Sequence, residues 1–198
     1  MIDLTVALIV FLFPLAYSPG PGNMFFAANG ARFGLRATLP AHVGYHIATW
    51  IITVAIGLGF AAALERFPAV FVWLKWAGSA YVLYLAWRFF RAGAIEADGA
   101  ARPASFADGV ILLVLNPKAY AIIILMFSQF LDLTRPQGIA VVGWIATVFT
   151  LNNLVAFLTW TAIGNRIAAL FRSQTSARRL NTGFGLILAG VALWMMSG

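Results

Sequence analysis

The chain has 198 residues, of which 62% are hydrophobic and only 10% are charged, and its formal net charge is +7. A soluble domain carries about a quarter of charged residues, and its apolar residues recur at helix or strand spacing rather than in unbroken runs. Here apolar runs of about 20 residues, the length of a helical membrane span, recur along the chain. The composition excludes a soluble domain and predicts an all-α integral membrane protein.

The N-terminal segment MIDLTVALIVFLFPLAYSPG carries no Lys or Arg before its apolar run. A secretory signal normally begins with a positively charged region, so we expect a permanent span here rather than a cleaved signal. Six spans can be drawn, and we expect one membrane domain over residues 1–198. The predicted spans are about 4–28, 37–63, 68–88, 107–131, 137–163 and 180–197.

The basic residues lie mainly in the linkers between these spans. The first, third and fifth linkers hold nine of them, and the second and fourth hold two. Because Lys and Arg accumulate in cytoplasmic loops, the positive charge indicates membrane topology rather than nucleic-acid binding. It predicts both termini on the outer side and a long cytoplasmic loop at about 89–106.

The first span is interrupted by turn-forming residues, and so is the fourth. Proline removes a backbone donor, and glycine weakens a helix. The interruption of span four, Asn116-Pro117, lies about half the chain after that of span one. Broken helices at corresponding places of two inverted halves are typical of a transporter binding site. The residues that interrupt span one are Ser18, Pro19, Gly20, Pro21 and Gly22.

We therefore predict two inverted three-helix repeats, at about 1–90 and 107–198, with helices 1 and 4 broken. In lipid, an unpaired backbone polar group is costly, so each break should face protein or a water-filled cavity. Its carbonyls and amides could then bind a polar solute. The alternative is a proline kink that serves only packing.

Lys118 follows the second break and lies near the middle of span four. A lysine at that depth is costly and should face the interior and find a partner. No Asp or Glu lies at a comparable depth in another span. We expect Lys118 to bind a substrate carboxylate or to take part in proton coupling. The alternatives are snorkelling to an interface or pairing with Asp108.

Other polar residues in the spans are weaker candidates. His42 and His46 lie four residues apart on one helix face, where interior hydrogen bonding is the first expectation and a proton relay another. Without a carboxylate or cysteine beside them, no metal site is predicted. Asn152 and Asn153 lie at a depth similar to that of Lys118, and one of them, with Asn152 as the candidate for substrate binding, could line the same cavity. Together with Lys118, the candidates for proton coupling are His42, His46 and Asp108.

Several segments in order resemble one family over nearly the whole chain: SPGPGNMFFAANGARFGLRATLPAHVGYH, AGSAYVLYLAWRFFRAG, FADGVILLVLNPKAYAIIILMFSQF and LNTGFGLILAGVALW. They resemble the LysE/RhtB family of amino-acid exporters. The resemblance implies a secondary carrier of the bacterial inner membrane that exports amino acids or close derivatives, uses the proton motive force and needs no cofactor. It implies a functional core of Pro19, Gly20, Pro21, Asn116, Pro117 and Lys118.

Gly22 and Asn23 complete the predicted binding segment, and Gly22 stands where members of the family differ. The lack of a carboxylate in the middle of the membrane argues against a cationic substrate side chain. The alternatives are a channel or exporter for another small polar metabolite and, less favoured, an intramembrane enzyme. Protons and lipid are expected partners, and six short spans are compatible with a homodimer.

Overall fold

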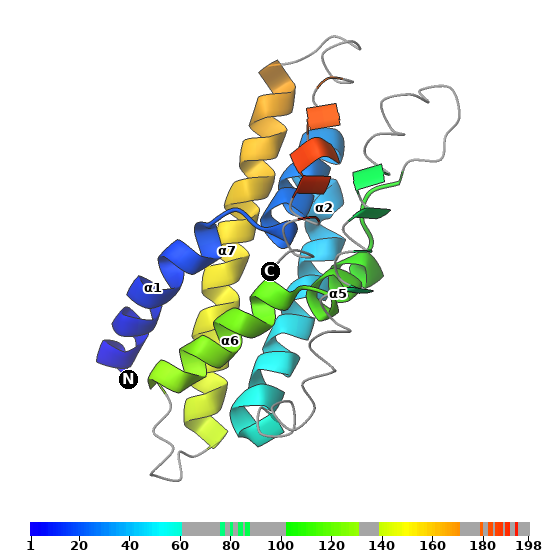
Figure 1. Ribbon diagram of the computed structural model, residues 1–198. Helices are drawn as coiled ribbons and strands as arrows, with labels where there is room; N and C mark the ends of the chain where they lie inside the picture. The colour runs from blue at the N-terminus through cyan, green and yellow to red at the C-terminus, as the bar shows by residue number, and fades with distance from the viewer. Residues whose placement is uncertain are drawn as a thin grey trace.

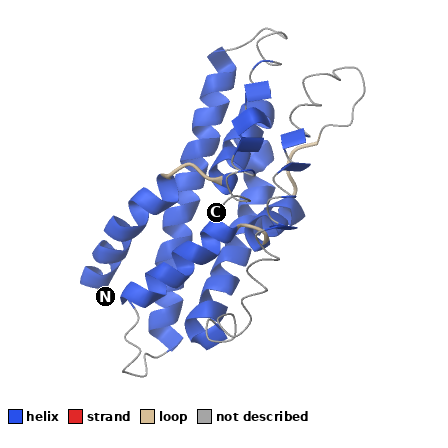
Figure 2. Ribbon diagram, in the orientation of Figure 1, coloured by secondary structure: helices blue, strands red, loops and turns tan. Residues whose placement is uncertain are grey.

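The computed structural model describes residues 1–60, 102–130 and 139–170, together with single residues between 76 and 87 and between 179 and 193. In these ranges every regular element is a helix, as Figure 2 shows. The third and sixth predicted spans, and most of the linker at 89–106, lie outside the described residues apart from those single positions. An all-helical fold is confirmed for the described part, and the six-span count and the repeats stay predictions.

The first predicted span is broken where the Pro-Gly sequence predicts. Helix α1 covers Ile2–Tyr17, and helix α2 begins at Pro21 and is assigned to Ala55. Between them the backbone is extended, with φ −64° and ψ 141° at Ser18 and φ −171° and ψ 177° at Gly20. Pro19 has no N–H with which to continue the helix, whereas Pro21 occupies the first helical turn, where that loss costs nothing.

Helix α2 reverses direction at Gly34, whose φ of 80° and ψ of 169° are non-helical. A positive φ of this kind favours glycine. The segments before and after Gly34 lie side by side, because the ring of Phe26 stacks on His42 with centroids 4.0 Å apart. The turn falls in the first predicted linker. A π-helical turn, Ile56–Phe60, continues α2 beyond Ala55.

The second break also lies where the sequence predicts it. Helix α5 covers Phe106–Val114 and helix α6 covers Pro117–Phe130, and the two are bent by 63°. The Tyr120 hydroxyl donates to the Val114 carbonyl at 3.1 Å and so satisfies one acceptor that the break exposes. At the start of α5, Ser105 and Asp108 form a capping box.

Helix α7, Ile139–Leu170, runs along both α1 and α2 (Figure 1). In the described ranges, the segments Pro21–Gly59 and Ile139–Ile167 are long and apolar enough to cross a membrane, and α5 with α6 makes a third candidate if the bent pair is one span. Since Pro21–Gly59 reverses at Gly34, its length is shared between two antiparallel helical segments.

Glycines hold these helices close. A Cβ on Gly30 would overlap the Thr161 carbonyl of α7, and one on Gly164 would overlap the Ala27 carbonyl of α2. Gly44 of α2 and Gly109 of α5 form a second reciprocal pair, against the carbonyls of Phe106 and Ala41. Small residues of this kind let helix backbones approach closely in membranes. These contacts fix the positions of the two breaks.

Candidate functional site

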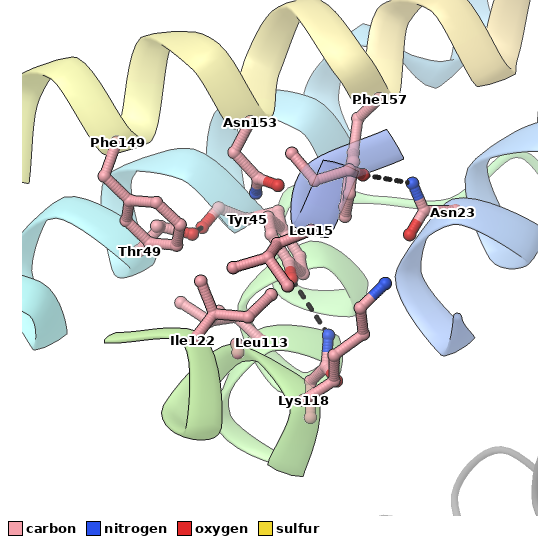
Figure 3. A pocket seen from close by; sticks show the side chains of 13 residues that line it. Leu15, Asn23, Tyr45, Thr49, Leu113, Lys118, Ile122, Phe149, Asn153 and Phe157 are labelled. Carbon is pink, nitrogen blue, oxygen red and sulfur yellow. Dashed lines mark hydrogen bonds between the residues drawn. The ribbon is translucent and has the colours of Figure 1, made fainter. Parts of the chain in front are cut away.

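The two breaks meet at one small cavity among α1, α2, α6 and α7 (Figure 3). Its volume is about 20 Å³, which is room for about one water molecule. The cavity is therefore too small for an amino acid in this conformation. Its polar lining residues are Asn23, Tyr45, Thr49, Asn116, Lys118 and Asn153, and its apolar ones are Leu15, Ala16, Leu113, Ala119, Ile122, Phe149 and Phe157.

Lys118, in the first turn of α6, reaches across to the break before α2. Its ammonium donates to the Ser18 carbonyl at 2.7 Å, to the Ser18 hydroxyl at 2.9 Å and, more weakly, to the Pro19 carbonyl at 3.5 Å. The lysine thus finds an interior partner, as a costly intramembrane charge should. Pairing with Asp108, one alternative from sequence, is wrong, because Asp108 pairs with Arg102 instead. Snorkelling to an interface stays an untested alternative.

Gly20 and Gly22 make room for large neighbours at this site. A Cβ on Gly20 would lie 2.9 Å from Lys118 Cδ and 3.0 Å from Nζ, so the lysine side chain passes directly over this residue. A Cβ on Gly22 would lie 2.7 Å from Phe157 Cζ. The two prolines act through the backbone, since Pro21 begins α2 and Pro117 begins α6.

Asn116 and Asn23 hold the helix ends at the two breaks in place through side-chain hydrogen bonds. The Asn116 amide donates to the Tyr45 hydroxyl at 3.0 Å, and the Asn23 amide donates to the Ala16 carbonyl at 2.9 Å. Asn116 is 4% exposed, and its Oδ1 has no hydrogen-bond partner. A buried acceptor without a donor is expensive, so this atom is ready to accept a hydrogen bond from a water or a ligand.

His42 and His46 lie elsewhere. His42 Nε2 is 2.9 Å from the Thr161 hydroxyl, and His46 Nδ1 is 2.8 Å from the His42 carbonyl. The expected interior hydrogen bonding is confirmed. Both rings line an apolar groove between α2 and α7 with a volume of about 640 Å³, rather than the cavity that holds Lys118.

Asp108 and Asn152 are also separate from the cavity. Asp108 accepts hydrogen bonds from the backbone N–H and hydroxyl of Ser105, each at 2.8 Å, and forms a salt bridge of 3.2 Å with Arg102. Asn152 does not line the cavity, and its buried Nδ2 has no hydrogen-bond partner. Its role in substrate binding stays a prediction.

Sequence reasoning missed several residues of the lining. Tyr45 is 1% exposed and carries the hydroxyl that holds Asn116. On α7, Phe149 and Phe157, which sequence reasoning missed, line the cavity together with Asn153, one of the two amides expected at this depth. Their spacing of four residues places them on one helix face, and that signal was present in the sequence. The four-residue spacing favours Asn153 over its neighbour Asn152 as the amide on the helix face that lines the cavity.

Among the described residues that line the cavity there is no carboxylate, and Lys118 supplies the one formal charge. Backbone carbonyls and amide oxygens supply the acceptors. Such a site suits a small ligand that carries a carboxylate for the lysine and polar hydrogens for the carbonyls. In the described residues no group of three His, Asp or Glu side chains comes together to hold a metal ion.

Comparison with known proteins agrees with this architecture. A family model described as LysE type translocator matches residues 13–198. The chain is 31% identical to an uncharacterized membrane protein of Pseudomonas aeruginosa, covering 87% of this chain and 85% of that protein. It is 27% identical to the homoserine/homoserine lactone efflux protein of Salmonella typhimurium and 26% identical to the cysteine/O-acetylserine efflux protein of Escherichia coli K12, with 90% of each chain covered in both cases. No solved structure matches it. The chain therefore belongs to the LysE family of translocators.

Proposed function

We propose that this protein is a secondary carrier that exports small neutral amino acids, or close derivatives, from the cytoplasm at the expense of the proton motive force. The observation that carries the proposal is the meeting of two helix breaks at a small, partly polar cavity, with Lys118 on one break bonded to Ser18 on the other. Broken helices that face each other in this way are the usual site of secondary transporters. The efflux activities in the names of two relatives support the same function.

The lining indicates the substrate class. The carboxylate of an amino acid meets the Lys118 ammonium and the free amides at the start of α2, where the helix dipole also favours negative charge. Its ammonium meets backbone carbonyls of the first break or Asn116 Oδ1. Because no carboxylate is among the described lining residues, a cationic side chain would lack a partner there. Asn152 and Gly22 remain further candidates for substrate contact.

The arrangement of the charged helix ends supports the predicted topology. A Cβ on Gly34 would lie 3.8 Å from Asn165 Oδ1, so the turn that carries Arg32 and Arg36 lies beside the end of α7 that carries Arg166. The amino-terminal end of α1 lies at the opposite end of α7, where Trp144 donates to the Thr5 hydroxyl at 2.9 Å. With the basic end in the cytoplasm, the N-terminus faces outward. We place the protein in the inner membrane, with both termini outside.

Transport proceeds by alternating access to this site from the two sides of the membrane. The glycine pairs join helices of the two predicted halves, Gly30 to Gly164 and Gly44 to Gly109. A rocking of one half against the other therefore pivots at these contacts, and the breaks supply the freedom to move. Among the candidates for proton coupling, Lys118 alone lines the cavity, whereas His42, His46 and Asp108 lie outside it.

The alternatives differ in what they require. A channel or pore for another metabolite needs a continuous polar path, whereas here the polar groups gather around a cavity the size of one water molecule. An intramembrane enzyme could use Ser18 with Lys118 as a nucleophile and base. The Ser18 hydroxyl, however, donates to the Leu15 carbonyl at 2.9 Å and accepts from Lys118 at 2.9 Å, so it does not donate its proton to the lysine as a nucleophile paired with a base would.

The test is efflux from bacteria that are sensitised to amino-acid excess and loaded with labelled dipeptides. We expect export of one or a few neutral amino acids, with loss of that export in Lys118→Ala and in the presence of an uncoupler. Thr159→Ala is the control, since the Thr159 hydroxyl bonds only the carbonyl of Val155 in its own helix. If folded protein exported no amino acid, the substrate class would be wrong.

A further inference from the structure

Almost all backbone carbonyls at the end of α1 accept a hydrogen bond from a donor whose position is fixed by the fold. Helix ends leave such acceptors without intrahelical donors, so each needs a partner. The partners are the backbone N–H of Ser18 for Pro14 at 3.1 Å, the Ser18 hydroxyl for Leu15 at 2.9 Å, the Asn23 amide for Ala16 at 2.9 Å and the Trp160 indole for Tyr17 at 3.3 Å. The Gly20 carbonyl accepts from the Met24 N–H at 3.0 Å. Only the carbonyls of Ser18 and Pro19 depend on a long flexible side chain.

That side chain is Lys118, and its contacts describe a site for a primary ammonium. An ammonium has three hydrogens, and the Ser18 carbonyl, the Ser18 hydroxyl and the Pro19 carbonyl offer three oxygens to it. No carboxylate of the described ranges bonds Lys118, so its charge depends on these neutral oxygens. The same oxygens would accept hydrogen bonds from any other primary ammonium group that can come as close to them.

We propose that these Ser18 and Pro19 oxygens form an ammonium site that Lys118 occupies in the empty carrier and that the substrate's α-ammonium occupies in the loaded one. The inference rests on the proposed function, and it adds an exchange of one ammonium for another. The incoming carboxylate draws the Lys118 ammonium away from Ser18, and the α-ammonium takes its place. After the exchange the lysine is paired with a carboxylate and the break carbonyls keep a donor, so no charge or carbonyl is left unpaired in a low-dielectric site.

The small volume of the cavity explains why the exchange would enlarge the site. Its volume of about 20 Å³ admits about one water molecule, and the lysine stem lies over Gly20 at its edge. When the ammonium leaves Ser18, the stem leaves this position and its volume becomes available. Asn116 Oδ1, buried on the cavity wall without a donor, offers a further acceptor to the incoming ammonium. A ligand with only one of the two charges cannot complete the exchange.

The first arm of the test is chemical rescue in purified protein. Lys118→Ala leaves the Ser18 site empty, so we expect n-propylammonium to raise its melting temperature saturably, with at least about tenfold higher affinity than for the wild type, whose site is filled. Tetramethylammonium carries the same charge without hydrogens to donate, and it should have no saturable effect. Equal responses of the two proteins to n-propylammonium, or equal effects of the two cations on the variant, would overturn the proposal.

The second arm compares homoserine, homoserine amide, which carries the cation alone, and N-acetylhomoserine, which carries the carboxylate alone. We expect the wild type to bind homoserine at least about tenfold more tightly than the other two, and Lys118→Ala to gain affinity for the amide by a similar factor. Gly20→Ala, whose methyl group would push Lys118 aside, should shift the preference in the same direction if Lys118→Ala does not fold. An amide affinity that neither variant raises would contradict the exchange.

The two arms separate this inference from the proposed function. If n-propylammonium rescues Lys118→Ala but the wild type neither binds nor exports homoserine or another amino acid, the ammonium site stands and amino-acid export is wrong. If the wild type exports an amino acid but neither variant gains affinity for a primary ammonium, export stands and the exchange is wrong.

Discussion

Replacing Gly164 by alanine tests whether close backbone contact between α2 and α7 positions the first break. A methyl group at Gly164 would overlap the backbone carbonyl of Ala27, and Gly30 makes the reciprocal contact with α7. The obstacle is backbone rather than the end of a flexible side chain, so the helices themselves must separate. Overpacking of this kind costs about 1–3 kcal/mol or more, and the loss of a helical glycine returns about 1 kcal/mol. We expect a net destabilisation of about 2 kcal/mol.

Gly143 provides the matched control on the same helix. A Cβ there would meet nothing within 4 Å, so Gly143→Ala should stabilise the protein by up to about 1 kcal/mol through helix propensity alone. The two variants should therefore differ by about 3 kcal/mol, roughly a hundredfold in the unfolding equilibrium. Thermal unfolding of purified protein in detergent, followed by the monodisperse fraction, measures this difference. Equal melting temperatures would refute the close packing of α2 on α7.

Three smaller perturbations follow from the same contacts. Tyr45→Phe removes the hydroxyl that accepts from Asn116, so it should cost about 1–3 kcal/mol in thermal unfolding and reduce the efflux rate. Ser105→Ala removes the N-terminal cap of α5, and we expect a loss of about 1 kcal/mol with efflux retained at low temperature, as a melting curve and an efflux assay would show. Asp108→Asn keeps an acceptor for the cap and weakens the pairing with Arg102, which is 60% exposed, so the loss of this pair should cost less than about 1 kcal/mol and efflux should stay sensitive to uncoupler. Uncoupler-insensitive efflux in Asp108→Asn would instead identify Asp108 as the group that couples the proton.

The helix breaks could be predicted from sequence because proline and glycine act locally. Pro19 and Pro117 lack the N–H that a continuing helix needs, and the structure interrupts both helices next to them. The conformation of Gly34 was harder to predict, since the linker between the first two spans was expected here but the sequence does not show which of its residues takes a positive φ. The positions of both breaks were therefore correct before any long-range contact was known.

The partner of Lys118 could not be predicted in the same way. Composition required some interior partner and offered Asp108 as the nearest carboxylate, ten residues away in the chain. The actual partner is a backbone carbonyl about half the chain away, at Ser18. Every residue has a carbonyl, so sequence cannot distinguish the one that a distant fold leaves free. Tyr45 was missed for a related reason, because the role of its hydroxyl depends on a hydrogen bond with Asn116, which is distant in sequence.

The most direct test of the central claim is efflux of preloaded homoserine, cysteine and other neutral amino acids from proteoliposomes under an imposed proton gradient. The wild type and Thr159→Ala should transport at least one of them at equal rates. Lys118→Met keeps the length of the side chain and removes its charge-assisted hydrogen bonds of about 1.5–3 kcal/mol, so its rate should fall by about tenfold or more. Transport by Lys118→Met at the wild-type rate would contradict the assignment of the substrate site to the place where the two helix breaks meet.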